Sequence, residues 1–206
     1  MNLFVTFEGG EGSGKSTVLK QVNEILLSEG HSTLLTREPG GTPISEQIRN
    51  VILDKANTSM DPRTEALLYA ASRRQHLVEK IWPALKEGKI VLCDRFLDSS
   101  LAYQGGARGL GMDEILEVNR YATEGQFPDI TLFFDLDPSI GLQRIAANAG
   151  REVNRLDLER MTFHEKVRAS FQKLASLYPE RYVTIDASQP LEKVVEDSLK
   201  AIKAKL

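Results

Sequence analysis

Residues 9–16 read Gly-Gly-Glu-Gly-Ser-Gly-Lys-Ser, and this short stretch fixes the class of the fold. It satisfies the phosphate-loop pattern, in which two glycines five positions apart are followed by lysine and serine. The glycines allow the backbone to curl with its amide hydrogens around an anion, while Lys15 adds a charge and the Ser16 hydroxyl can bind a metal ion. The pattern predicts a site for a nucleoside triphosphate with Mg²⁺.

The flanking sequence supplies the strand and the helix that a phosphate loop requires. Residues 2–8 form a β-branched and aromatic run, and apolar residues recur at helical spacing over residues 15–27. A Gly-rich turn would also match the pattern, but it would need neither of these neighbours. The predicted nucleotide-binding residues are Gly9, Gly10, Glu11, Gly12, Ser13, Gly14, Lys15, Ser16 and Thr17.

Length, charge and composition limit the class of protein. The 206 residues fit one α/β domain over residues 1–206, and the single cysteine, Cys93, lies in an apolar run that predicts a buried thiol. A net charge of -3 gives no overall field for nucleic acid or an anionic membrane. No run approaches the ~18 apolar residues that span a bilayer. We therefore expect a cytoplasmic protein that binds neither nucleic acid nor membranes.

Five candidate strands alternate with helical patterns along the chain. This alternation predicts a mainly parallel five-stranded sheet with helices on both faces, and such sheets bind ligands at the carboxyl ends of their strands. The predicted strands are residues 2–8, 32–37, 89–94, 130–136 and 181–186.

Polar residues follow several of these strands. Arg37 ends the second strand, before a turn whose proline and glycines do not themselves require an arginine. Asp94 ends the third strand, where a carboxylate can hold Mg²⁺ directly or through water; capping a helix is the alternative. Asp135 and Asp137, after the fourth strand, are predicted to be structural, at the start of the next helix.

Two further segments carry candidate ligand contacts. Asp61 and Pro62 predict a helix start, and on this helix Tyr69 and Arg73 share one face that could stack on and bond a nucleobase. From spacing alone, a core tyrosine and a solvated arginine are the more common explanation of such a pair. Pro83 is expected to kink or end the helix.

Residues 148–158 form a short polar stretch that predicts a mobile lid. Its arginines, Arg151 and Arg155, could neutralise charge on a transferring phosphoryl group. An ordinary solvated loop is the alternative. The variable positions of the phosphate loop contain no arginine, which favours the lid.

Taken together, residues 7–16, 37–42, 64–73, 94–105 and 154–157 resemble the bacterial thymidylate kinases. Their order and spacing match from residue 4 to about residue 170. The resemblance implies a three-layer P-loop kinase fold with a short lid. It also implies transfer of the γ-phosphoryl group of ATP to dTMP, giving dTDP and ADP for dTTP synthesis, with Mg²⁺ and usually in a homodimer.

The same resemblance assigns roles to individual residues. Tyr69 would stack on thymine, Arg73 would bond its carbonyl, and Ser100 and Gln104 would complete the hydrogen bonds of the base. Tyr103 would lie beneath the sugar. The remaining substrate contacts would come from Glu11 at the 3′-hydroxyl and from Arg37, Pro39, Arg49 and Arg95 around the acceptor phosphate. The catalytic residues would be Lys15, Arg95, Arg151 and Arg155, and the metal ligands Ser16 and Asp94.

The chain departs from the family pattern at three positions, with Tyr69 where phenylalanine is usual, Phe96 where tyrosine or histidine is usual, and Phe171 where tyrosine is usual. Stacking by Tyr69 is preserved, but hydrogen bonds made elsewhere at the other two positions are absent.

Three other functions are weighed against this one. A deoxynucleoside kinase would need a carboxylate base, for which Glu38 or Asp94 could serve, and a different nucleoside monophosphate kinase would share most of the motifs. A guanine-nucleotide switch would carry Asn-Lys-x-Asp and Asp-x-x-Gly segments, which the sequence lacks. None of the three histidines lies beside a candidate nucleophile, and His76 and His164 are predicted to be packing or surface residues.

Overall fold

The computed structural model describes residues 2–147 and 155–206. Its core is one five-stranded sheet with the order β2-β3-β1-β4-β5, in which every pair of neighbours is parallel. Each predicted strand is confirmed, with ends shifted by at most one residue. The strands are β1 (Leu3–Glu8), β2 (Thr33–Arg37), β3 (Ile90–Asp94), β4 (Ile130–Asp135) and β5 (Tyr182–Asp186).

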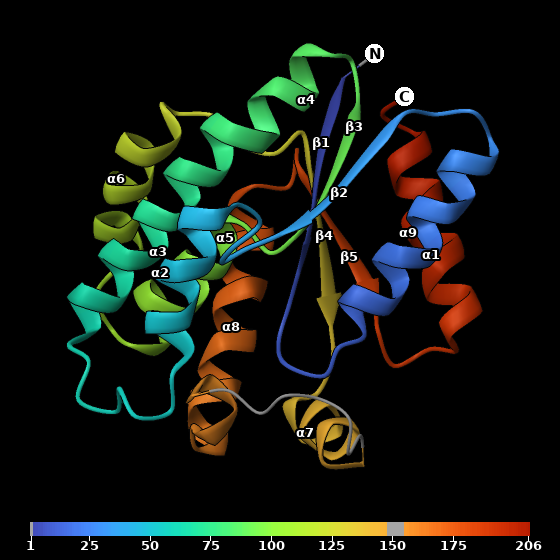
Figure 1. The fold of residues 1–206 in the computed structure, drawn as a ribbon. Coiled ribbons are helices and arrows are strands. Elements are labelled where there is room, and N and C mark those ends of the chain that lie inside the picture. Colours follow the sequence, from blue (N-terminus) through green and yellow to red (C-terminus); the bar gives the residue numbers. More distant parts are fainter. Residues whose placement is uncertain (1, 148–154) are drawn as a thin grey trace.

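Helices cover both faces of this sheet (Figure 1). Helices α1 and α9 lie side by side on one face, and α3, α4, α6 and α8 lie on the other. The α-helices are α1 (Lys15–Ser28), α2 (Pro43–Leu53), α3 (Pro62–His76), α4 (Trp82–Lys86), α5 (Leu97–Ser100), α6 (Met112–Thr123), α7 (Pro138–Ala147), α8 (Met161–Leu177) and α9 (Leu191–Lys203). Two π-helical segments, η1 (Leu77–Ile81) and η2 (Leu101–Ala107), and a 3-10 helix, η3 (Arg155–Leu158), complete the set.

Alternation along the strands produces two apolar cores. Leu3, Val5 and Phe7 of β1 pack with α1 and α9, whereas Phe4 packs with α4 and α8. Both faces of a parallel sheet are buried, so every side chain of β1 is buried, including those of Thr6 and Glu8. The result is the three-layer α/β architecture expected from the sequence.

The strand order brings the predicted ligand residues to one edge. Phe7 of β1 is in register with Asp94 of β3, and Asp94 is in register with Arg37 of β2. The segments that follow these strands therefore leave the sheet side by side. The phosphate loop, which follows the central strand β1, lies at the middle of this edge.

The long helical segment starts as predicted and runs through η1 and α4 to Lys86. The Asp61 carboxylate accepts hydrogen bonds from the amides of Arg63 (2.9 Å) and Thr64 (3.1 Å), which caps α3. Pro83 does not end the helical path. The π-helical segment η1 leads into α4, and Pro83 stands in the first turn of α4, where a missing amide hydrogen costs least.

The segment that follows β4 starts with a structural aspartate, as the sequence predicts. Asp137 accepts a hydrogen bond from the amide of Ser139 (2.9 Å) at the start of α7, as predicted for a structural residue. Of the predicted lid, residues 148–154, including Arg151, lie outside the described residues. Across residues 2–147 and 155–206, no helix has the length and apolar character needed to cross a membrane.

Candidate functional site

A cavity of about 1000 Å³ opens at the carboxyl ends of β1, β2 and β3. It runs from the phosphate loop to the side of α3 that faces α5 and η2. Seven of the nine predicted nucleotide-binding residues line it, from Glu11 to Thr17. Every residue predicted to bind the acceptor also lines it: Glu11, Arg37, Pro39, Arg49, Tyr69, Arg73, Arg95, Ser100, Tyr103 and Gln104.

The phosphate loop forms one end of the cavity. Gly14 has a φ of 84° directly before α1, a conformation that glycine adopts without strain, so the loop turns sharply into the helix. Gly12 has a φ of 70°, and a Cβ atom added there would lie 2.1 Å from the carbonyl oxygen of Gly141 in α7. The loop therefore packs directly against α7, and its amides and the amino end of α1 form a site suited to an anion.

Lys15 is held over this loop. Its Nζ atom donates to the carbonyl oxygen of Gly10 (2.8 Å) and to Ser13 Oγ (3.1 Å). Burial, together with the nearby Arg95 guanidinium, lowers the pKa of Lys15 to about 8. The loop thus holds a buried cation close to its titration point, positioned to meet a phosphate.

Ser16 and Asp94 form the candidate metal site beside the loop. The Ser16 hydroxyl donates to the Asp94 carboxylate, so two oxygen atoms of the kind that Mg²⁺ prefers lie together. Within residues 2–147 and 155–206, no three His, Cys, Asp or Glu side chains converge as metal ligands. Mg²⁺ commonly takes one or two protein oxygens and completes its shell with phosphate and water, so this pair fits it.

The turn after β3 is held by a buried carboxylate, Glu8. Its Oε1 atom accepts from the Phe96 amide (2.7 Å), and its Oε2 atom accepts from Ser99 Oγ (2.6 Å). Arg95, directly before Phe96, has a φ of 69°, which is rare for a residue with a side chain. Burial raises the pKa of Glu8 above its usual range, and the Asp98 carboxylate adds to this shift. Sequence analysis missed this role, and the only signal was an acidic residue ending an apolar strand.

Arg95, fixed by this turn, reaches across to the phosphate loop. Its Nη2 atom donates to Glu11 Oε1 (2.8 Å) and its Nη1 atom to the carbonyl oxygen of Gly9 (3.0 Å). The Tyr103 hydroxyl donates to the same Glu11 oxygen (3.0 Å). Glu11, Arg95 and Tyr103 therefore meet at the junction between the loop and the rest of the cavity.

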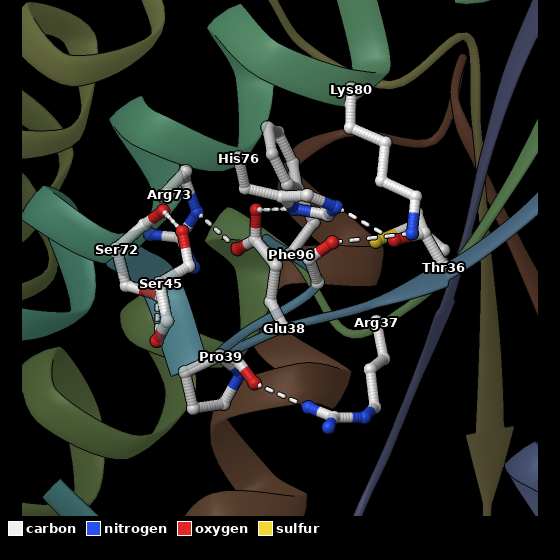
Figure 2. A network of polar contacts seen from close by, with 12 residues as sticks. Thr36, Arg37, Glu38, Pro39, Ser45, Ser72, Arg73, His76, Lys80 and Phe96 are labelled. Carbon is white, nitrogen blue, oxygen red and sulfur yellow. Dashed lines mark hydrogen bonds and ion pairs between the residues drawn. The ribbon is translucent and has the colours of Figure 1, made fainter. Parts of the chain in front are cut away.

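Two arginines meet at the rim. Arg37 Nη1 and Arg49 Nη1 both donate to the carbonyl oxygen of Pro39, at 2.9 and 3.0 Å, and Figure 2 shows the contact of Arg37. Arg37 also pairs with Glu46 (2.9 Å). The shared carbonyl brings two guanidinium groups together on the side of the cavity formed by β2 and α2, which creates a concentrated positive charge there.

The opposite wall is formed by α3 and the segments α5 and η2. Arg73 is only 1% exposed, and its guanidinium donates to Glu38 Oε2 (2.8 Å), to Ser100 Oγ (3.1 Å) and to Asn119 Oδ1. Gln104 Nε2 donates to Glu65 Oε1 (2.8 Å). The alternative of a solvated Arg73 is therefore wrong, because this arginine is buried in a polar wall of the cavity.

The described end of the lid contacts this same wall. Arg155 donates from Nε to the carbonyl oxygen of Ile52 (3.0 Å) and from Nη2 to Glu65 Oε2, and its side chain is buried. Of residues 155–158, Leu156 lines the cavity and Arg155 does not. A contact of Arg155 with donor phosphates stays a prediction, and it requires this arginine to leave Glu65.

Three buried residues of the wall, Glu38, Glu65 and Asn119, were not among the predicted site residues. Each acts on a predicted residue from a distant part of the chain. No spacing rule links such pairs. The only sequence signal was the position of Glu38 directly after Arg37 at a strand end.

Comparison with known proteins agrees with this geometry. The sequence model of the family described as "Thymidylate kinase" matches residues 7–198. The thymidylate kinase of Bacillus velezensis is 60% identical over 204 residues, covering 99% of this chain and 96% of that protein. The thymidylate kinase of Halalkalibacterium halodurans is 57% identical over 203 residues, covering 98% and 97%.

A solved structure extends the likeness to the fold. The crystal structure of thymidylate kinase from Ehrlichia chaffeensis matches with a TM-score of 0.79 and 34% sequence identity, covering 98% of each chain. The family match, the full-length relatives and the shared architecture lead to one conclusion: the chain belongs to the thymidylate kinase family.

Proposed function

We propose that the chain transfers the γ-phosphoryl group of ATP to dTMP, giving dTDP and ADP in the synthesis of dTTP. One observation carries the proposal: a phosphate loop and a buried polar wall containing Arg73, Ser100 and Gln104 line the same cavity. The relatives that are 57–60% identical over nearly the whole chain carry the name of this activity. The catalytic unit is a single P-loop kinase domain over residues 1–206.

The donor end binds ATP. The loop amides and Lys15 hold the donor phosphates, and Ser16 with Asp94 holds Mg²⁺. When bound, Mg²⁺ neutralises negative charge on the phosphate oxygens. The lid arginines, Arg151 and Arg155, complete the charge neutralisation when the acceptor is present, because the loop itself contains no arginine.

The acceptor end binds dTMP. Tyr69 stacks on thymine, and Arg73, Ser100 and Gln104 supply its polar contacts. Tyr103 lies beneath the deoxyribose, and its 3′-hydroxyl faces Glu11. The acceptor phosphate is held by Arg37, Arg49 and Arg95, with Pro39 in the same segment.

Three arginines at the acceptor position favour a monophosphate over a nucleoside. A phosphate monoester has a second pKa of about 6, so it is already largely dianionic at neutral pH and needs no general base. A nucleoside kinase would need one for its neutral hydroxyl. Glu38 is poorly suited to that role, since both of its carboxylate oxygens already accept hydrogen bonds from the wall. Catalysis then consists of in-line positioning and charge neutralisation, chiefly by Lys15 and Arg95.

The working state is a homodimer in the cytoplasm, by resemblance to the family. Exposed apolar side chains on α2 and α3, among them Val51 (48% exposed) and Leu67 (58% exposed), support an interface on these helices. Light scattering of the purified protein tests the dimer, and a monomer at all concentrations would exclude it.

The activity is tested by measuring ADP release with ATP, Mg²⁺ and a panel of acceptors. We expect turnover with dTMP well above that with dUMP, dCMP, dGMP or AMP, and none with thymidine. Turnover of thymidine alone would make the chain a nucleoside kinase. Preference for another monophosphate would change the assigned base, and slow hydrolysis unaffected by any acceptor would favour a nucleotide switch.

A further inference from the structure

We propose that Glu38 and His76 are positioning residues that fix the Arg73 guanidinium, and that affinity for the base of the acceptor depends on this fixation. The inference rests on the proposed function, because it deepens the role of Arg73 at the thymine site. Neither residue is among those assigned above to contact a substrate. Figure 2 shows the network that they form with Thr36 and Arg73.

Glu38 is the centre of the network. Its Oε2 atom accepts from Arg73 Nε (2.8 Å), and its Oε1 atom accepts from His76 Nδ1 (3.0 Å). Its side chain is 3% exposed. A buried carboxylate with one donor on each oxygen has a single favourable orientation, so Glu38 transmits the position of His76 to Arg73.

His76 is fixed in turn from its other side. The imidazole is fully buried (0% exposed), and its Nε2 atom lies 2.7 Å from Thr36 Oγ1. Because the Glu38 carboxylate only accepts hydrogen bonds, Nδ1 carries a proton, which sets the orientation of the ring. The segment that contains Gly41 packs closely against the imidazole, since a Cβ atom added to Gly41 would lie 2.7 Å from His76 Nε2.

The network ends at the guanidinium group of Arg73, which lines the cavity. Arg73 Nε is held by Glu38, and Nη1 donates to Ser100 Oγ and Asn119 Oδ1. Within residues 2–147 and 155–206, Nη2 makes no hydrogen bond, and Arg73 lines the cavity. The guanidinium also lies over the Phe96 ring, 5.1 Å from its centroid. Two of the guanidinium nitrogens, Nε and Nη1, thus fix the orientation of Arg73, and Nη2 remains to donate to a base carbonyl.

The chain of contacts joins three separate elements. Thr36 belongs to β2, Glu38 to the segment after it, and His76 and Arg73 are three residues apart on α3. Arg73 and His76 therefore share one face of the helix, and both reach the same carboxylate. A rigid helix and a sheet edge hold the ends of the network. Glu38 lines the cavity, but both of its carboxylate oxygens are bonded to Arg73 and His76, and His76 lies outside the cavity, so the network acts on the base through Arg73.

The test measures dTMP and ATP affinities by calorimetry, together with kcat and both KM values. Glu38→Gln keeps the shape but places an amide donor against one of the two partners, and we expect the dTMP Kd to rise about tenfold with ATP affinity within about twofold. His76→Leu removes the donor to Glu38 and should raise the dTMP Kd in the same direction. His76→Asn retains a donor near the Nδ1 position and should restore most of the loss.

A double-mutant cycle separates positioning from general damage. If Glu38 acts through Arg73, Glu38→Gln adds nothing to the dTMP Kd of Arg73→Ala. His164→Leu is the matched control, because His164 is another buried helical imidazole (4% exposed) outside the cavity, and it should leave dTMP affinity unchanged. Thermal unfolding confirms that each variant is folded. If Glu38→Gln does not fold, the test uses Thr36→Val, which replaces the hydroxyl with a methyl group, and the two His76 variants.

The outcomes distinguish the inference from the function on which it rests. A parent enzyme that does not phosphorylate dTMP contradicts the proposed function itself. An active parent in which Glu38→Gln and His76→Leu leave the dTMP Kd unchanged contradicts the inference alone. Additive effects in the Arg73→Ala background, or an equal loss of ATP affinity, would likewise overturn it.

Discussion

The two ends of the cavity are built in different ways. At the donor end, Lys15 bonds Gly10 and Ser13, so the position of its charge is set within one continuous segment of backbone, to which Asp94 and Arg95 add contacts from β3 and the turn after it. At the acceptor end, the partners of Arg73 lie far away in sequence: Glu38 at 35 positions, Ser100 at 27 and Asn119 at 46. The position of Lys15 is therefore set locally, while the acceptor end exists only when separate elements have packed together.

Because of this difference, turnover and acceptor affinity can be changed independently. A substitution in the phosphate loop alters charge and turnover without disturbing α3, whereas a substitution in the polar wall changes acceptor affinity and the packing of several elements at once. We expect single substitutions and a change of pH to show whether the two ends of the cavity behave independently.

The largest expected effect comes from Lys15→Met, which keeps the aliphatic stem and removes the cation. We expect kcat to fall about 1000-fold, because charge on the transferring phosphoryl group loses a preorganised partner. The dTMP Kd should change by no more than about twofold, since the acceptor wall is built elsewhere. Steady-state kinetics and calorimetry measure the two quantities. Lys20→Met, at an exposed position of α1, is the control, and a parallel loss of dTMP affinity would show that the two ends are not separable.

Arg73→Ala tests the other end. We expect the dTMP Kd to rise about 100-fold, because a buried charged donor to the base is lost, while the ATP Kd stays within about twofold. The variant should also be less stable by about 3 kcal/mol, since the buried Glu38 carboxylate loses its cationic partner. Calorimetry and denaturant unfolding measure the two effects. Arg74→Ala is the control, because the neighbouring Arg74 is 41% exposed and pairs with Glu124. Equal losses of ATP and dTMP affinity would remove Arg73 from the acceptor site.

The two ends should also differ in their response to pH. Lys15, with a pKa lowered to about 8, is charged below that pH and neutral above it. The kcat/KM for ATP, which reports the free enzyme, should therefore fall above pH 8, approaching tenfold per pH unit. An arginine does not lose its charge in this range, so the dTMP Kd should stay constant between pH 7 and 9. A kcat/KM for ATP that stays constant up to pH 9.5 would contradict a functional role for the Lys15 charge.

The same difference decides what the sequence could predict. All five strands, the phosphate loop and the Asp61 cap follow from local patterns, because a short stretch of residues carries the whole signal. Tyr69 and Arg73 could be placed on one helix face, but their burial could not be deduced, since it depends on where α5, η2 and α6 pack. Recognition of the family, rather than spacing, assigned them to the acceptor.

The three acids that were missed from the sequence share one physical property. Glu8, Glu38 and Glu65 are buried carboxylates whose partners come from distant elements. The positions of Glu8 and Glu38 at or directly after a strand end are the only sequence signals, and they do not reveal the partners of these acids. His76 was predicted to be a packing or surface residue; it is buried, but it also forms the polar contact with Glu38. Such contacts arise from topology, and a periodicity along one segment carries no information about them.

The smallest expected effect is that of Tyr69→Phe. The Tyr69 ring lines the cavity and is 9% exposed. Its hydroxyl makes no hydrogen bond to the described residues. The hydroxyl oxygen is not fully buried, so it is exposed to the cavity. Removing an oxygen that bonds only water costs little, and we expect the dTMP Kd to change by less than about twofold. Tyr69→Leu, which removes the aromatic face, should raise it about tenfold.

This pair of variants isolates stacking from hydrogen bonding at the acceptor end. If Tyr69→Phe weakened dTMP binding as much as Tyr69→Leu, the hydroxyl rather than the ring would make the contact, and Tyr69 would join Arg73 among the polar groups of the wall. If neither variant altered the dTMP Kd, the base would not lie against α3 at this position. A large effect of Tyr69→Leu alone would mean that the Tyr69 ring stacks on the base and that Arg73 makes the polar contact of α3 with the base. ATP affinity should remain constant in both Tyr69 variants, because Tyr69 does not contribute to the donor end.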